Sequence, residues 1–147
     1  MPNYIFYGTA EGLIVLYNLT NFTRAAVWQL PRFIATDKNT AAVQEIVPNP
    51  GEPTFLAIRK DGQFFLFGQD SPEVAMTFEA PPGGISRIVW LDSVSGDFVL
   101  GSKSAGVLRL YNVAQPNYKE IIKVSRHGIY DIKRMTSEIY LLRLKNG

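Results

Sequence analysis

Short runs of alternating or continuous apolar residues recur along the chain, separated by glycine, proline, asparagine and aspartate. Examples are LIVLYN at 13–18, FFLFG at 64–68 and VLRLYN at 107–112. Alternation of apolar and polar positions is typical of a β-strand with one buried face, and short continuous apolar runs fit strands buried on both faces. No segment keeps the 3.6-residue period of an amphipathic helix over three turns. We therefore expect an all-β chain in which helices are minor.

These runs belong to a repeat that is anchored on glycine. Gly12, Gly62 and Gly106 each precede an apolar run, and each run contains a leucine followed by an aromatic residue. Gly147 occupies the anchor position of a fourth, truncated copy. The anchors lie 50, 44 and 41 residues apart, and the first spacing is longest because of an insertion around residues 32–39. Self-similarity at such a spacing is typical of repeat architectures.

Each repeat contains up to four strand-like segments, which we number first to fourth in chain order. VQEIV at 43–47 is a first strand, YIFYG at 4–8 a second, FFLFG at 64–68 a third and VAMTF at 74–78 a fourth. Four short strands per repeat of about 40 residues predict the four-stranded antiparallel blades of a β-propeller. We expect a single partial β-propeller of about three blades plus partial strands, with blade segments at 3–30, 42–79, 85–124 and 129–147.

The end of each third strand resembles a WD repeat, in which this tail is typically Leu-Trp-Asp. The tail reads Leu-Tyr-Asn at 16–18, Leu-Phe-Gly at 66–68 and Leu-Tyr-Asn at 110–112. The pairs Gly101-Ser102 and Gly8-Thr9 also fit the family's pattern. The resemblance covers nearly the whole chain and implies a β-propeller of the kind that serves as a scaffold for protein interaction.

The repeats depart from the WD pattern at their polar positions. The Gly-His pair that normally opens a unit is missing, and His127-Gly128 has the reversed order. The aspartate that would pair with that histidine is not evident either. The buried Asp-His-Ser-Trp network of the family is therefore absent, and we expect aromatic packing to replace it.

The strand count predicts an incomplete ring. The chain reads as second to fourth strands, two full blades and then a first and a second strand. Closed propellers have about four to eight blades, so three blades would leave sheet edges and apolar faces exposed. We expect the remaining blades to come from the rest of a longer chain, from another subunit or from a second copy. In the last case two chains would close a six-bladed ring, with a surplus strand at 139–144.

Composition gives little support to an enzyme. The 147 residues include no cysteine and one histidine, and the net charge is +2. No nucleophile, metal-ligand cluster or transmembrane run is recognisable, and the glycine-rich segment 101–106 lacks the lysine of a phosphate loop. We therefore expect no catalysis, no cofactor, no membrane span and no nucleic-acid partner. The lack of cysteine and of a signal peptide favours an intracellular location, cytoplasmic or nuclear.

The repeat register predicts a basic rim. In a propeller, the turns between second and third strands share a rim with the connections between blades. Acidic residues should gather on the opposite rim. We hypothesise that the basic rim binds an acidic or phosphorylated segment of a protein partner; solvated loop charges are the alternative. The predicted rim residues are Arg59, Lys60, Lys103, Arg126, His127 and Lys145.

Two further features are candidates for partner binding. The insertion carries Arg32 and Phe33 in a connection that is short in the other repeats. Binding residues are common on such loops. Trp28 lies on a fourth strand just before the insertion and is a candidate anchor for a neighbour.

Glu45, Arg87 and Asp131 occupy one position in three successive first strands. Neighbouring blades would place these charges side by side, so that Arg87 could pair with both acids. We interpret this row mainly as a device that sets the register between blades.

The sequence therefore predicts a non-catalytic, WD-repeat-like scaffold for protein interaction. The alternative is a propeller assembled from two identical chains that binds a small ligand or a glycan. A hydrolytic propeller is a weaker alternative, because no catalytic arrangement is visible.

Overall fold

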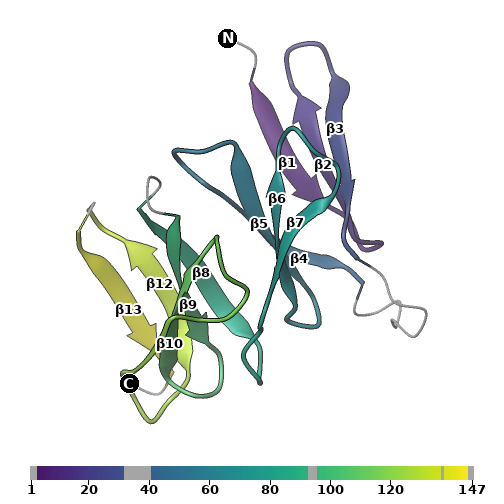
Figure 1. The fold of residues 1–147 in the computed structure, drawn as a ribbon. Coiled ribbons are helices and arrows are strands. Elements are labelled where there is room, and N and C mark those ends of the chain that lie inside the picture. The colour runs from purple at the N-terminus through teal and green to yellow at the C-terminus, as the bar shows by residue number, and fades with distance from the viewer. Residues whose placement is uncertain (1–2, 32–40, 93–95, 137, 146–147) are drawn as a thin grey trace. The chain divides into compact units, whose positions relative to one another are not determined.

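In the computed structural model, residues 3–31, 41–92, 96–136 and 138–145 are described. Every regular element within these ranges is a β-strand, as Figure 1 shows. The chain divides into two compact units. Unit 1 comprises Met1–Pro48 and Pro53–Thr77, and unit 2 comprises Asn49–Glu52 and Phe78–Gly147. The prediction of an all-β fold is confirmed.

The strands form antiparallel sheets, and each sheet consists of strands that follow one another in the chain. The first sheet has three strands and the second has four, in the orders β1-β2-β3 and β4-β5-β6-β7. Their strands are β1 (Tyr4–Gly8), β2 (Leu13–Asn18), β3 (Thr23–Gln29), β4 (Val43–Pro48), β5 (Thr54–Arg59), β6 (Phe64–Gly68) and β7 (Val74–Phe78).

The third sheet again has four strands, and the fourth has two. The prediction of four-stranded antiparallel blades is therefore confirmed for both complete repeats. The strands are β8 (Ile85–Asp92), β9 (Asp97–Ser102), β10 (Val107–Asn112) and β11 (Glu120–Lys123), followed by β12 (Ile129–Arg134) and β13 (Tyr140–Leu144).

The anchor glycines have a common backbone role. Gly12, Gly62 and Gly106 end the turn between the second and third strands, with φ of +87°, +93° and +60°. A side chain is strained in this left-handed conformation, whereas glycine adopts it freely. At Gly12 a Cβ would also lie 2.7 Å from the carbonyl oxygen of Ala41. The repeat is therefore anchored on glycine because the turn requires it.

The first strands share a β-bulge that the sequence did not reveal. Register shifts occur between Val43 and Glu45 in β4, between Ile85 and Arg87 in β8, and between Ile129 and Asp131 in β12. A bulge adds one residue to a strand and redirects the side chains after it. The three charged residues of the predicted row therefore each follow the same bulge.

Aromatic residues form much of the core in both units. In unit 1 Phe55 and Phe67 stack with ring centroids 5.3 Å apart, and Trp28 packs edge-on against Phe55 at 4.9 Å. In unit 2 Phe98 and Tyr111 stack at 5.2 Å. Phe78 packs edge-on against both, at 5.3 and 5.9 Å. Trp28 in unit 1 and Phe78 in unit 2 thus pack at equivalent positions against aromatic rings of the repeat that follows.

Candidate functional site

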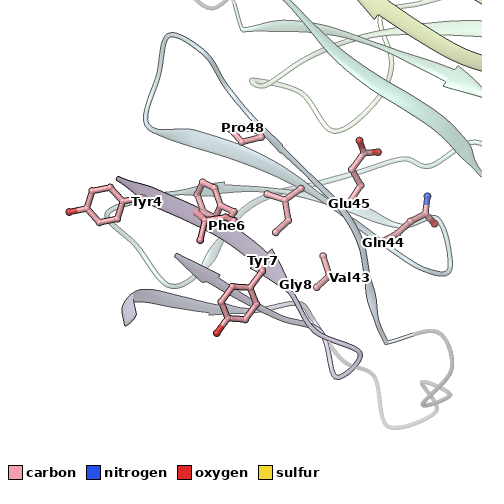
Figure 2. A pocket seen from close by; sticks show the side chains of 10 residues that line it. Tyr4, Phe6, Tyr7, Gly8, Val43, Gln44, Glu45 and Pro48 are labelled. Atoms are coloured by element: carbon pink, nitrogen blue, oxygen red, sulfur yellow. The ribbon is translucent and has the colours of Figure 1, made fainter. Parts of the chain in front are cut away.

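Unit 1 contains a groove between β1 and β4 with a volume of about 580 Å³. In Figure 2, the side chains of Tyr4, Phe6 and Tyr7 project from β1, and Gln44 and Glu45 project from β4. Aliphatic and aromatic residues therefore line most of the groove, together with one amide and one carboxylate. Of the residues that line the groove, Glu45 alone was among the predicted site residues.

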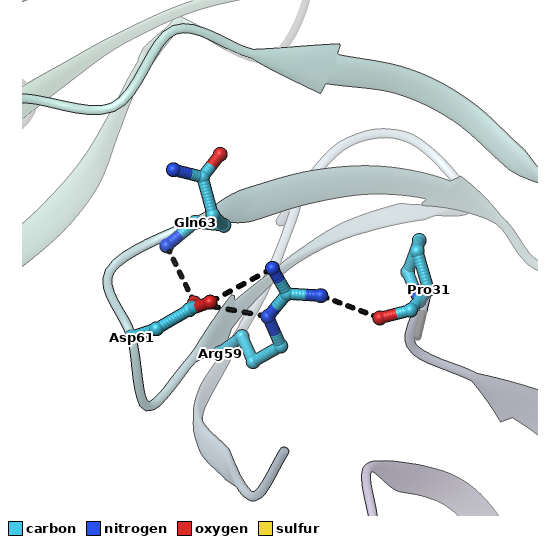
Figure 3. A network of polar contacts seen from close by, with 4 residues as sticks. All are labelled: Pro31, Arg59, Asp61 and Gln63. Atoms are coloured by element: carbon cyan, nitrogen blue, oxygen red, sulfur yellow. Dashed lines mark hydrogen bonds and ion pairs between the residues drawn. The ribbon is translucent and has the colours of Figure 1, made fainter. Parts of the chain in front are cut away.

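The side chain of Arg59 is buried in unit 1 and is not exposed at a rim. Its side chain is only 3% exposed and forms an ion pair with Asp61, with Nη2 2.8 Å from Oδ2. Its Nε donates to Asp61 Oδ1 at 2.9 Å, and its Nη1 donates to the carbonyl oxygen of Pro31 (Figure 3). The prediction that Arg59 offers its charge to a partner is therefore wrong, because this charge is used inside unit 1.

Arg59 and the backbone together control the ionisation of Asp61. Burial raises the pKa of Asp61, but hydrogen bonds from Arg59 and from the N–H of Gln63, with the attraction of the guanidinium, outweigh it. The pKa of Asp61 is therefore lower than its ordinary value, and the carboxylate is charged at neutral pH. The pair fastens the turn after β5 to the segment that follows β3.

Trp28 is also buried, with 2% of its surface exposed. Its Nε1 donates to the carbonyl oxygens of Gly68 and Ser71, at 3.2 and 2.8 Å. The prediction that Trp28 contacts an external partner is therefore wrong, because its ring is used within unit 1. Trp28 instead anchors β3 to the end of β6 and the turn that follows.

Two other predicted residues lie outside the described part of the chain, and one remains exposed. Arg32 and Phe33 fall within residues 32–40 and are not described. Lys60 is exposed in the turn after β5, and its N–H donates to the carbonyl oxygen of Ala42 at 2.9 Å. Its role in partner binding stays a prediction.

Unit 2 brings the other four predicted rim residues to one end of its sheets. Lys103 lies in the turn after β9, Arg126 and His127 lie between β11 and β12, and Lys145 follows β13. All four are exposed. They come from three separate connections, which makes their common location a property of the fold and not of one loop.

Glycine has no side chain, and at two positions this allows the backbones of these connections to come into contact. A Cβ on Gly128 would collide with the carbonyl group of Lys103, and a Cβ on Gly106 would collide with the carbonyl oxygen of His127. The N–H of Lys145 donates to the carbonyl oxygen of Gly128 at 2.9 Å. The backbone therefore fixes the origins of four basic side chains relative to one another.

A fifth basic residue at this end was missed by sequence reasoning. Lys123 is exposed and pairs in register with Val107, the residue after Gly106. Its place at the end of a fourth strand is the signal that could have included it. We call Lys103, Lys123, Arg126, His127 and Lys145 together the basic surface of unit 2.

Arg87 and Asp131 of the predicted charge row form an ion pair within unit 2. Arg87 Nε lies 2.8 Å from Asp131 Oδ1 and joins β8 to β12. The hydrogen bond from Arg87 lowers the pKa of Asp131 below its ordinary value. Glu45 follows the equivalent bulge in β4, and its pairing with Arg87 stays a prediction.

Neither a metal site nor a membrane helix is present in the described ranges. No group of three or more histidine, cysteine, aspartate or glutamate residues in these ranges could hold a metal ion. No helix in the same ranges is long and apolar enough to cross a membrane.

Comparison with solved structures identifies the fold. A crystal structure of Saccharomyces cerevisiae Sqt1, a WD40 β-propeller protein, matches 88% of this chain with a TM-score of 0.72 and 14% sequence identity. The chain spans 34% of the length of that protein. No family model and no curated protein sequence match the chain. The fold is therefore WD-repeat-like.

Proposed function

We propose that the chain is a non-catalytic interaction scaffold whose basic surface binds an acidic or phosphorylated segment of a protein partner. The observation that carries the proposal is the convergence of basic residues from separate connections at one end of unit 2. Because backbone contacts join these connections, the backbone that carries the basic side chains is ordered before a partner binds, which lowers the entropic cost of binding. An intracellular partner fits a chain without cysteine.

The chemistry of the basic surface favours an anion with several oxygens. Lysine ammonium and arginine guanidinium groups donate charge-assisted hydrogen bonds to carboxylates and phosphates. The nearby acid Asp131 already accepts a hydrogen bond from Arg87, which limits its competition for the basic side chains. The small net charge of +2 makes the local cluster, and not the charge of the whole chain, the basis for selecting a partner.

Charge reversal at Lys103 tests the proposal. The probe is a short fluorescent polyglutamate peptide with a central phosphoserine, and its affinity is measured by fluorescence anisotropy. We expect Lys103→Glu to weaken binding about fivefold, because it replaces an attraction by a repulsion. Lys133→Glu is the matched control, since it makes the same charge change at an exposed position on β12, away from the basic surface.

The location of the effect decides the outcome. Loss of affinity in Lys103→Glu with little change in Lys133→Glu supports binding at the basic surface. Equal losses in both variants would mean that only net charge matters, and an unchanged affinity in Lys103→Glu would remove the surface from the proposed function.

A further inference from the structure

In unit 2, strand β8 contacts both β9 and β12. It pairs with β9 in antiparallel register and also lies against β12. Its Arg87 faces Gly101 on β9 and forms the ion pair with Asp131 on β12. The first strand of one repeat is therefore held by the second strand of the same repeat and by the first strand of the next.

Unit 1 contains the counterparts of both strands that contact β8. Strand β1 is the second strand of its repeat, as β9 is, and β4 is the first strand of the next repeat, as β12 is. One contact demonstrates the equivalence: a Cβ on Gly101 would lie 2.9 Å from Ile129, the first residue of β12. A Cβ on Gly8 would likewise collide with Val43, the first residue of β4. The groove lies between β1 and β4, in the place that β8 fills in unit 2.

The edge of β1 that is not paired with β2 carries backbone groups suited to a further strand. The N–H of Thr9 donates to the carbonyl oxygen of Leu13, and the N–H of Leu19 donates to that of Asn3. Hydrogen-bonded positions alternate in an antiparallel pair, so the backbone N–H and C=O groups of residues 3, 5, 7 and 9 point toward β2. The N–H groups of Tyr4, Phe6 and Gly8 therefore point away from β2, and no described strand pairs with that edge.

The side chains along the groove favour a strand of definite chemistry. Phe6 and Ile46 pack against the core of unit 1, while Tyr4 and Ile5 are 49% and 48% exposed. Covering such residues favours apolar side chains on the incoming strand. Glu45 lines the groove at the position where Asp131 meets Arg87 in unit 2. A carboxylate has two oxygens and can accept from several donors, so a basic residue opposite Gly8 is favoured.

We propose that the groove between β1 and β4 binds an extended segment of a partner protein, which pairs antiparallel with β1 as an added strand. The segment has apolar residues and places one arginine or lysine opposite Gly8, close to Glu45. Backbone pairing with an exposed edge provides affinity, and the side-chain positions provide specificity. This proposal is independent of the basic surface, which lies in unit 2.

The probe is a synthetic peptide with the sequence of β8, ISRIVWLD, flanked by a solubilising polar tag. We expect it to bind the full chain and to slow hydrogen exchange at the amides of Tyr4, Phe6 and Gly8. The amides of Ile5 and Tyr7 should change little, because they already face β2. This alternating pattern distinguishes strand addition from unspecific adhesion.

A charge swap tests the selection by Glu45. Replacing the peptide's arginine by glutamate should weaken binding about tenfold, and Glu45→Lys in the chain should weaken the original peptide similarly. The glutamate peptide should recover its affinity with Glu45→Lys. Glu73→Lys is the matched control, because it makes the same charge change at an exposed position after β6.

The proline variant Tyr4→Pro provides a second test of the edge. It removes one N–H that faces the groove and leaves the pairing of β1 with β2 intact, as proline is tolerated at edge positions. We expect it to weaken peptide binding while the circular dichroism spectrum is unchanged. Exchange protection without the alternation, full binding by Tyr4→Pro, or a second copy of the chain as the only species that binds would each overturn the proposal.

Discussion

In each unit an aromatic residue from the end of a fourth strand packs against the next repeat, and we call this contact the joint. The side-chain hydrogen bonds at the two joints run in opposite directions. In unit 1 the aromatic residue of the fourth strand is the donor, because Trp28 Nε1 donates to the end of β6 and the following turn. In unit 2 the equivalent residue is Phe78, which has no donor. There Tyr111 on β10 donates its hydroxyl to the carbonyl oxygen of Glu79 at 2.5 Å. Phe67, the counterpart of Tyr111 in unit 1, has no hydroxyl.

An aromatic donor therefore lies at this joint in each unit, on the fourth strand in unit 1 and on the following third strand in unit 2. A buried indole or phenol needs a hydrogen-bond partner, and in both units a backbone carbonyl group provides it. Burial raises the pKa of Tyr111, so its hydroxyl remains protonated and able to donate. These repeats therefore share the packing of their aromatic rings, while the polar contact can be built from either strand.

A third copy of this position shows what the joint requires. Ile122 lies as far after Gly106 as Trp28 lies after Gly12, and it is 42% exposed. The fourth sheet that follows has two described strands, so no described third strand covers Ile122. Burial at this position thus depends on the next repeat and not on the residue's own strand.

The largest expected effect is the loss of the ring in unit 1. Trp28→Ala should lower the free energy of unfolding by about 3–5 kcal/mol, because it removes a buried aromatic side chain and leaves a cavity. Ile122→Ala at the exposed equivalent position should cost less than about 1 kcal/mol. Urea unfolding of both variants checks this difference. A similar cost at the two positions would contradict the account of the joint.

A smaller difference in the free energy of unfolding is expected between the Arg59–Asp61 and Arg87–Asp131 ion pairs when the aspartate is replaced. Asp61→Asn should cost about 2 kcal/mol, because it leaves the buried Arg59 without its carboxylate. Asp131→Asn should cost less than about 1 kcal/mol, because Arg87 is 42% exposed and water can replace its partner.

The pH dependence of this effect follows from the direction of the pKa shift. The folded-state pKa of Asp61 is lower than its ordinary value of 3.8. Its contribution is therefore complete above the unfolded-state pKa and is lost as pH falls through the folded-state pKa. The stability difference between the original chain and Asp61→Asn should shrink below about pH 4, as followed by urea unfolding at several pH values. A constant difference would contradict the role of the ionised carboxylate.

Much of the fold could be predicted from the sequence, because periodicity and turn chemistry are local. The anchor glycines marked turns that need a left-handed residue, and alternation marked the strands between them. The burial of Arg59 and Trp28 could not be predicted, because it depends on segments remote in the chain. The aromatic residues of the core are visible in the sequence, but which ring donates the hydrogen bond depends on the three-dimensional contacts.

Some residues of the candidate sites could also be predicted from the sequence, and others could not. Lys103 and His127 could be assigned to one end of a repeat, because strand order determines which connections meet. The shared bulge before Glu45 and Arg87 has no clear sequence signal, since it is a feature of strand pairing. The groove beside β1 depends on what lies next to an edge, and strand patterns alone do not show that.

The two units are built from copies of one repeat, and the joint between successive repeats can take its hydrogen bond from either side. The most direct test is a double-mutant cycle that gives unit 1 the residues of unit 2, with Trp28→Phe, Phe67→Tyr and the double variant compared by urea unfolding. We predict that Phe67→Tyr recovers about 1 kcal/mol in the Trp28→Phe background, because the new hydroxyl donates to the carbonyl oxygen of Gln29. Strictly additive losses would contradict the claim.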